Sequence, residues 1–232
     1  MIRKKITIWI LLGVLVGSCL GLFTGCRIPD NWWENLPDTS FETKCVTTDE
    51  GFKYYVDEDI GVCLLAFPDS EDIIVPEYID EMPVAQLGYT DKGLAYMNHY
   101  VIDGSKVKKL TLQHNVTVYY ISLPRLDTLV YVDILNFFDD ASETIKISNR
   151  INGVHISLSP TVELKKGNHP ISFTNASLTT IEIPGYVTVI DAEVFSGLEN
   201  VIIKTSFTVK PDGWAEGWNG GCEVEWGVDF SI

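Results

Sequence analysis

Residues 178–203 read LTTIEIPGYVTVIDAEVFSGLENVII, and they carry the pattern from which the architecture can be predicted. Leu178, Ile181 and Ile183 are separated first by two variable residues and then by one. The final alternation has the period of a β-strand, which places its apolar side chains on one face. The same pattern starts again at Leu198. The stretch therefore predicts two strands that belong to one repeated structural unit.

Two earlier segments, residues 107–112 and 126–131, have the same pattern and nearly the same spacing between their starts. Residues 143–147 carry its second half, whereas residues 148–177 keep strand patterning without the period. A repeat of about 20 residues with a single alternating strand is the signature of a leucine-rich-repeat solenoid. No such unit can bury its apolar edge alone, so the units stack and share a core. The predicted fold class is mainly β, a leucine-rich-repeat solenoid.

Both ends of the predicted repeat array carry segments that would cover its core. Residues 52–56 and 62–67 flank the turn-rich sequence DEDIG, which predicts a β-hairpin at the N-terminal end. At the other end, Trp214, Trp218 and Trp226 supply large aromatic side chains that close an apolar core efficiently. A platform on which sugars stack is the alternative for these tryptophans, and the core-closing interpretation is favoured.

Three stretches resemble the BspA-type leucine-rich repeat proteins of bacterial surfaces. Residues 75–88 (VPEYIDEMPVAQLG) look like the opening phrase of that family, residues 178–198 are close to a whole repeat, and residues 214–227 are similar to the ending found after the last repeat. The resemblance implies a right-handed solenoid with a parallel sheet along one face. It also implies a surface adhesin or binding scaffold, whose partner is an extracellular protein or glycan.

The beginning of the chain predicts export and attachment to a lipid. Residues 1–5 (MIRKK) are cationic, residues 6–23 are uncharged, and Thr24-Gly25-Cys26 closes the segment, as in a secretory signal. The ending LFTGC resembles a bacterial lipobox, in which the thiol of Cys26 carries the lipid after cleavage. Cys19 is a second candidate, and an uncleaved anchor is the alternative because the uncharged stretch is just long enough to span a bilayer. Under each interpretation the rest of the chain faces outward from the cell membrane.

The sequence divides into five predicted parts: a lipoprotein signal peptide at 1–25, a tether at 26–50, an N-terminal β cap at 51–88, the repeats at 89–205 and a C-terminal cap at 206–232. The net charge of −15 argues against binding to nucleic acid, which carries the same sign of charge. Once Cys26 carries a lipid, the remaining Cys45, Cys63 and Cys222 cannot all pair, so the chain is not a disulfide scaffold. A Cys45–Cys63 bridge is one alternative, and buried thiols are the favoured interpretation.

The candidate binding strip consists of the residues that lie between the apolar positions of the predicted strands. These residues are expected to face the open side of the sheet, as solenoids offer extended binding surfaces there. The alternative is an ordinary solvated sheet face, on which threonine is a common strand residue. The strip comprises Lys109, Thr111, Thr128, Val130, Lys146, Thr180, Glu182, Asn200 and Ile202.

No catalytic residue, cofactor or metal ion is expected. The four histidines are isolated in the sequence, and no nucleophile-elbow, metalloprotease or phosphate-loop motif occurs. The acidic residues between 57 and 81 lack the spacing of a calcium loop, and they are interpreted as a solvated face. Two alternatives to a binding module remain: a glycan or cell-wall hydrolase that uses paired carboxylates, and a passive scaffold for surface display.

Overall fold

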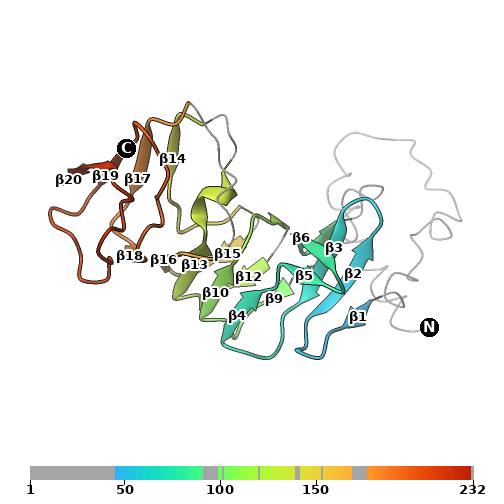
Figure 1. Ribbon diagram of the computed structural model, residues 1–232. Helices are drawn as coiled ribbons and strands as arrows, with labels where there is room; N and C mark the ends of the chain where they lie inside the picture. Colours follow the sequence, from blue (N-terminus) through green and yellow to red (C-terminus); the bar gives the residue numbers. More distant parts are fainter. Residues whose placement is uncertain are drawn as a thin grey trace, which may run out of the picture. The chain divides into compact units, whose positions relative to one another are not determined.

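Figure 1 shows the computed structural model of the protein, which describes residues 45–90, 99–100, 102–119, 121–138, 142–152, 154–168 and 177–230. These residues are mainly β-strands joined by turns. They include one 3-10 helix, Ile134–Phe137, and no α-helix. The prediction of a mainly β chain is therefore confirmed.

The N-terminal sheet contains the predicted hairpin. Strands β2 and β3 pair antiparallel, and the Asp57 carboxylate accepts hydrogen bonds from the backbone N–H groups of Asp59 and Ile60 in the connecting turn. Gly61, with φ of 108°, closes that turn in a conformation that favours glycine. The strands of this sheet are β1 (Val46–Thr47), β2 (Lys53–Asp57), β3 (Gly61–Ala66), β6 (Met82–Leu87) and β11 (Thr117–Val118), with β5 (Tyr78–Ile79) paired to β6.

The central sheet has five strands, and every neighbouring pair in it is parallel. Its inward side chains form apolar rows in register, such as Ile73, Leu110, Leu129, Val162 and Val187, all of which are buried. The strands in spatial order are β4 (Asp72–Val75), β10 (Lys109–Leu112), β13 (Thr128–Val132), β16 (Thr161–Lys165) and β18 (Val187–Ile190).

Two further parallel sheets contribute to the same hydrophobic core. One has four strands, in which Ile145, Ile181, Ile203 and Val224 form an inward row. The other has three strands. The four-stranded sheet consists of β14 (Thr144–Lys146), β17 (Thr180–Ile183), β19 (Ile202–Thr205) and β20 (Glu223–Trp226). The three-stranded sheet consists of β9 (Ile102–Asp103), β12 (Ile121–Leu123) and β15 (Val154–Ile156). A separate antiparallel pair is formed by β7 (Tyr89–Thr90) and β8 (His99–Tyr100).

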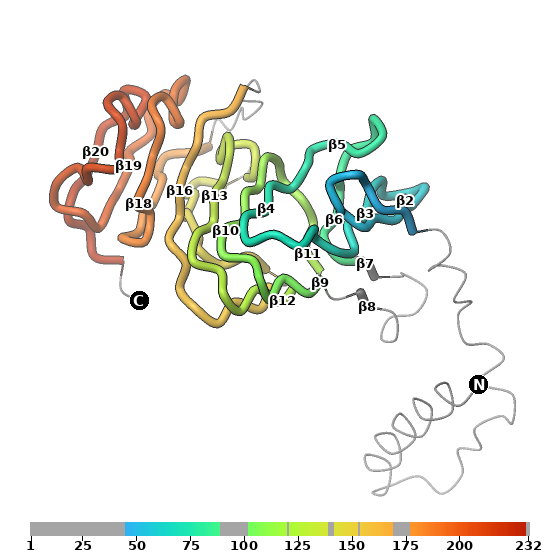
Figure 2. The backbone as a smooth tube through the Cα atoms, turned by 90° about the horizontal axis from the view of Figure 1, so that it is seen from below, coloured from blue at the N-terminus to red at the C-terminus, as the bar shows by residue number. Residues whose placement is uncertain are grey.

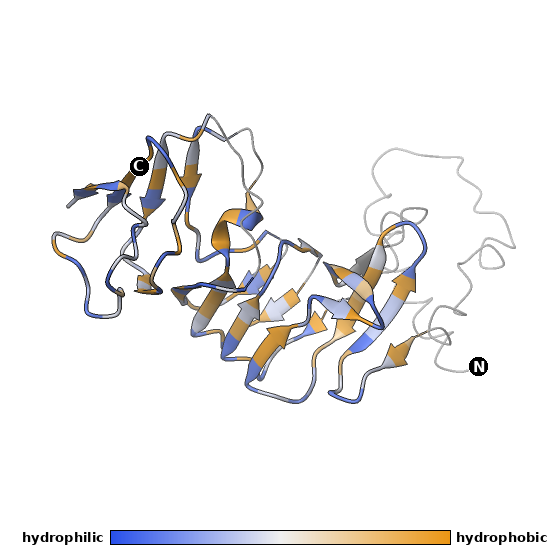
Figure 3. Cartoon of the chain, viewed as in Figure 1, coloured by the Kyte–Doolittle hydropathy of each residue, from blue (hydrophilic) through white to orange (hydrophobic). Residues whose placement is uncertain are grey.

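Parallel partners in these sheets come from successive passes of the chain, which can be followed in Figure 2. Lys109 pairs with Thr128 in the central sheet, and Ile102 pairs with Ile121 in the three-stranded sheet. The two residues of a pair are therefore the same number of residues apart in the sequence in both sheets. Parallel pairing needs a long crossover, because the chain must return to the same end of the sheet. Here the chain leaves one sheet, contributes to another, and returns beside its previous pass. Figure 3 shows apolar segments on strands of the four larger sheets.

The segments that share the sequence pattern all form strands, but they do not lie in one sheet. Strands β10 and β13 belong to the central sheet, whereas β14, β17 and β19 belong to the four-stranded sheet. The expected single sheet face is therefore wrong for these segments. The physical reason is that the pattern specifies only an inward side, and every sheet around this core has one.

The pairing of the second repeat with the first also differs from the alignment of their sequence patterns. The sequence pattern aligns Ile181 with Val201, because these residues occupy the same position after Leu178 and Leu198, but Ile181 pairs with Ile203 instead. A shift by two positions keeps the same side chains on the inward face, because the side-chain period of a strand is two. The sequence pattern alone could not separate the two registers.

Tryptophans cover the core at the C-terminal end. Trp214 and Trp218 are buried, with ring centroids 4.5 Å apart, and the Trp214 indole N–H donates to the carbonyl of Val187 at 3.2 Å. The backbone of Trp214 also forms an isolated parallel β-bridge with Ile190, the last residue of β18. Trp226 packs against both rings and is 38% exposed. Burial of Trp214 and Trp218 agrees with the core-closing interpretation and removes these two rings from any sugar platform.

Replacing Trp214 should test how much this cover stabilises the fold. Trp214→Ala is expected to lower the free energy of unfolding by about 3–5 kcal/mol, because it leaves a cavity and the carbonyl of Val187 loses its donor. Trp226→Ala is the matched control, since that ring is partly exposed and should cost clearly less. Denaturant unfolding of the full-length protein measures both. Equal losses would contradict the assigned role of Trp214.

Candidate functional site

The predicted binding strip is divided between two sheets. The central sheet holds Lys109, Thr111, Thr128 and Val130, and the four-stranded sheet holds Lys146, Thr180, Glu182 and Ile202. Asn200 does not lie on a strand: it occupies the turn before β19, with φ of 59°, and is exposed. The structure therefore does not bring the nine residues together into one continuous surface.

Two members of the strip are covered rather than open. Thr111 and Val130 are adjacent on neighbouring strands, and they are only 8% and 3% exposed. The Lys109 ammonium reaches across β13 to the Glu163 carboxylate, at an N–O distance of 3.3 Å. The stem of a lysine side chain covers apolar surface while its charged end stays in water. This ion pair thus covers Val130, and the expectation that Thr111 and Val130 face solvent is wrong.

Opposite charges alternate across the outward faces of both sheets. On the central sheet Lys165 lies 4.0 Å from Glu163 and 3.3 Å from Asp191. On the four-stranded sheet Lys146, Glu182, Lys204 and Glu225 stand in one row, with contacts of 3.5 Å between the first two and between the last two. Exposed ion pairs of this kind stabilise a fold by about 0–1 kcal/mol each. Their main effect is to neutralise the sheet faces, which leaves little charge there to attract a partner.

A groove of about 670 Å³ lies at the N-terminal end and is called the acidic groove below. Its wall includes Val46, Ile74 and Tyr78, which are 49%, 55% and 62% exposed. These are three of the six large apolar side chains that are exposed in the described part of the chain. Sequence reasoning missed this site, because its walls come from β1, β4 and β5, whose proximity depends on the fold.

The electrostatic character of the acidic groove is negative. Asp49, Glu50 and Asp80 line it, and no Lys, Arg or His is found among its described wall residues. The Tyr54 hydroxyl donates a hydrogen bond to Asp80, which fixes one carboxylate in the wall. That hydrogen bond, with smaller contributions from burial and from the charge of Asp80, raises the pKa of Tyr54. The phenol therefore stays neutral and continues to donate.

Other acids of the same region form ion pairs. Asp69 and Lys106 are paired, and Glu71 lies 2.9 Å from Lys108. The hydrogen bond and charge of Lys108 lower the pKa of the Glu71 carboxyl. Across the described ranges, no group of three or more His, Cys, Asp or Glu side chains is arranged to hold a metal ion.

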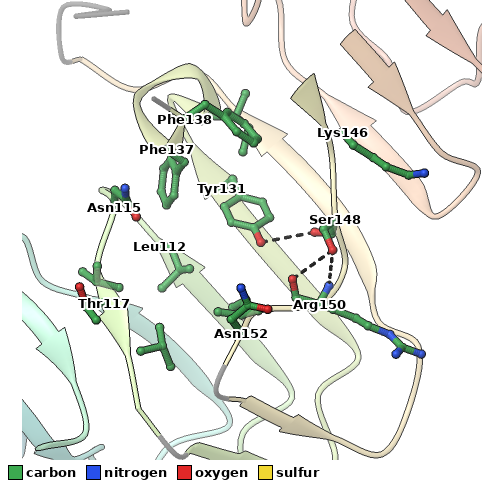
Figure 4. A pocket seen from close by; sticks show the side chains of 14 residues that line it. Leu112, Asn115, Thr117, Tyr131, Phe137, Phe138, Lys146, Ser148, Arg150 and Asn152 are labelled. Atoms are coloured by element: carbon green, nitrogen blue, oxygen red, sulfur yellow. Dashed lines mark hydrogen bonds between the residues drawn. The ribbon is translucent and has the colours of Figure 1, made fainter. Parts of the chain in front are cut away.

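A second cavity, of about 410 Å³, is called the aromatic cavity below. Its walls come from three successive segments, within residues 112–118, 131–138 and 146–152. Figure 4 shows the rings of Tyr131 and Phe137 beside each other; their centroids are 5.2 Å apart in an edge-to-face arrangement. The Tyr131 hydroxyl donates to the carbonyl of Ser148 at 3.3 Å, and burial raises the pKa of this phenol.

The segment that carries Phe137 into the aromatic cavity is held by a buried carboxylate. Asp133 precedes the 3-10 helix with φ of 51° and is 4% exposed. One of its oxygens accepts the backbone N–H of Gly167 at 2.8 Å and lies 3.7 Å from the Lys166 ammonium. A side chain at residue 167 would collide with this carboxylate, which explains why glycine stands there. The anchor joins the turn after β13 to the end of β16.

The described cysteines are buried or half-buried. Cys63 and Cys222 are buried thiols outside any disulfide, whereas Cys45 is half-buried and packs beside the cluster of Cys63 and Leu65. His114 bonds to the backbone carbonyl of Val84 at 2.6 Å, and His155 is exposed on β15.

Comparison with family models, with curated proteins and with solved structures finds no match to this chain. Among the described residues, no helix has the length and apolar character needed to cross a membrane. The predicted signal, both candidate lipidation sites (Cys19 and Cys26) and residues 26–44 of the predicted tether lie outside the described residues.

Burial of Cys63 predicts a dependence of stability on pH. Desolvation, assisted by the charge of Asp57, raises the pKa of the Cys63 thiol from 9.0 to about 12. The folded protein thus holds this proton more tightly than the unfolded chain does. The protonated Cys63 thiol therefore contributes to the free energy of unfolding. This contribution is complete below about pH 9 and is lost as the pH rises through the pKa of the thiol in the folded protein. Denaturant unfolding at increasing pH should show a shallower loss of stability for Cys63→Ala than for the unmodified protein, and an unchanged slope would contradict this assignment.

Proposed function

We propose that this chain is a bacterial, lipid-anchored protein of the outer face of the cell membrane, built as a leucine-rich-repeat solenoid that binds an extracellular partner without catalysis. The parallel pairing of successive passes and the apolar rows that continue from strand to strand support the solenoid. The signal-like beginning of the sequence supports export and attachment through Cys26.

The observation that carries the binding function is the acidic groove. Exposed apolar side chains are ordinary when scattered singly, but a contiguous apolar group with a polar rim marks an interaction site. Val46, Ile74 and Tyr78 share one concave wall with three carboxylates. The sheet faces, by contrast, neutralise their own charges and cover Val130.

The partner of the acidic groove is a protein segment that is apolar and positively charged. The groove offers carboxylates and no described cation, so a segment with Lys or Arg beside apolar residues complements it. Strand β4, which contributes Ile74, is the last strand of the central sheet and pairs with β10 alone among the described strands. An extended segment can add to such an edge through backbone hydrogen bonds. A second copy of this chain fits poorly, because each copy carries a net charge of −15.

Attachment through Cys26 can be tested separately from binding. Cells that express the full chain are fed a labelled fatty acid, and the label is expected on the unmodified protein and on Cys19→Ala. Cys26→Ala should lose the label, because no thiol remains at the cleavage site. Label that persists on Cys26→Ala but disappears from Cys19→Ala would assign the lipid to Cys19, and its absence from every form would contradict lipid attachment.

Binding at the acidic groove is tested with extended synthetic peptides of alternating valine and lysine. The full-length protein in detergent should bind them saturably and more weakly as salt rises, while peptides of alternating valine and glutamate should not bind. Ile74→Ser combined with Tyr78→Ser should raise the Kd about tenfold or more, since both side chains contribute apolar contact. Fluorescence anisotropy measures each Kd.

The matched control is a triple variant of the sheet faces, Lys109→Gln, Lys146→Gln and Glu182→Gln, which should bind the peptides normally. Loss of binding in the triple variant alone would move the site to the sheet faces. Equal binding of both peptide types, or no binding of either, would contradict the proposed partner chemistry.

A further inference from the structure

The aromatic cavity lies apart from the acidic groove in its lining residues and differs from it in chemistry. None of its described lining residues is an Asp or Glu, although the chain contains 32 of them. Lys146 and Arg150 reach its rim, but Figure 4 shows their charged ends directed away from the cavity. The Lys146 ammonium is engaged by Glu182 at 3.5 Å. The described lining thus brings no carboxylate to the cavity and turns its two cations away from it, which disfavours an ionic ligand and favours a neutral one.

The wall of the aromatic cavity is apolar and pre-formed. Tyr131 is fixed by its hydrogen bond to Ser148 and by its edge-to-face contact with Phe137, so its ring does not need to be ordered by a ligand. Phe137 and Phe138 are half-buried and keep part of their rings accessible. Rigid aromatic rings offer large apolar contact at a low cost in conformational entropy.

The rim of the aromatic cavity supplies directional polar groups. Asn115, Thr117 and Asn152 are exposed and line it. Each asparagine amide offers two donors and an acceptor, and the threonine hydroxyl offers both functions. Asn115 and Asn152 come from different passes of the chain, so their amides approach a bound ligand from different segments (Figure 4).

This combination matches the surface of a sugar ring. A pyranose has one face of C–H groups, which packs against an aromatic ring, and a periphery of hydroxyl groups, which need donors and acceptors in turn. A cavity of about 410 Å³ is within the range of small-ligand sites, which are mostly apolar with a few placed polar groups. A purely aliphatic ligand would leave the amides of Asn115 and Asn152 without a role.

We propose that the aromatic cavity is a carbohydrate-binding site that takes a neutral sugar unit of a glycan, with the half-buried Phe137, which the buried Tyr131 holds in place, against the ring and Asn115 and Asn152 on its hydroxyl groups. The inference does not rest on the proposed function, because the acidic groove and the aromatic cavity share none of their described lining residues.

The test is a calorimetric titration of the full-length protein in detergent with soluble oligosaccharides of glucose, of N-acetylglucosamine and of galacturonic acid. At least one neutral oligosaccharide is expected to bind saturably, and the galacturonate oligosaccharide should bind more weakly than the best neutral one. Phe137→Ala should abolish binding. Asn115→Ala combined with Asn152→Ala should weaken binding about tenfold or more, because the sugar hydroxyl groups lose two of their hydrogen-bonding partners.

The double asparagine variant keeps the test decisive if Phe137→Ala fails to fold, because both asparagines are exposed. Thr144→Ala is the control for an exposed strand residue outside the cavity, and it should bind sugar normally. Ile74→Ser with Tyr78→Ser should also bind sugar normally, which separates this site from the acidic groove. The proposal is overturned if no neutral oligosaccharide binds, if the double asparagine variant binds as well as the unmodified protein, or if galacturonate binds best.

Discussion

The structure depends on apolar rows that continue in register from one parallel strand to the next. The row of Ile73, Leu110, Leu129, Val162 and Val187 illustrates the constraint, since its members are buried by neighbours in adjacent passes together with the rest of the shared core. A slip of one residue would turn every side chain of a strand to the other face. Burial thus excludes a slip of one residue, and the tryptophans complete the arrangement where the rows end.

The sequence predicts those features that depend on near neighbours in the chain. The hairpin of β2 and β3 follows from two alternating runs and a turn between them, and the inward positions Leu110, Ile181 and Ile203 follow from period two. The assignment of strands to sheets does not follow, because an inward position fits any sheet. Burial of Val130 was also unpredictable, since it depends on Lys109 meeting a carboxylate that is distant in the sequence, that of Glu163. Both candidate cavities depend on segments that only the folded chain brings together.

The charge of the chain is distributed unevenly in a way that net charge cannot reveal. Acids on the sheet faces meet lysines from adjacent strands, as Glu182 meets Lys146 and Glu225 meets Lys204. The carboxylates around Tyr54 and Ile74 have no described cation beside them in the groove. The aromatic cavity has no carboxylate among the lining residues that the structure describes. Three local environments of neutralised, negative and uncharged character therefore coexist on one strongly acidic chain.

The two asparagines at the rim of the aromatic cavity lie outside the strands, whereas the residues of the apolar rows lie on strands. Asn115 and Asn152 are exposed and belong to no in-register row. The nearby Leu112 and Tyr131, by contrast, are paired neighbours in such a row, on β10 and β13. Substitutions at the two asparagines alter what the cavity displays without touching the pairing that holds the passes together. Ligand preference and folding thus depend on separate residues, so descendants of this chain can acquire new recognition while they inherit the same framework.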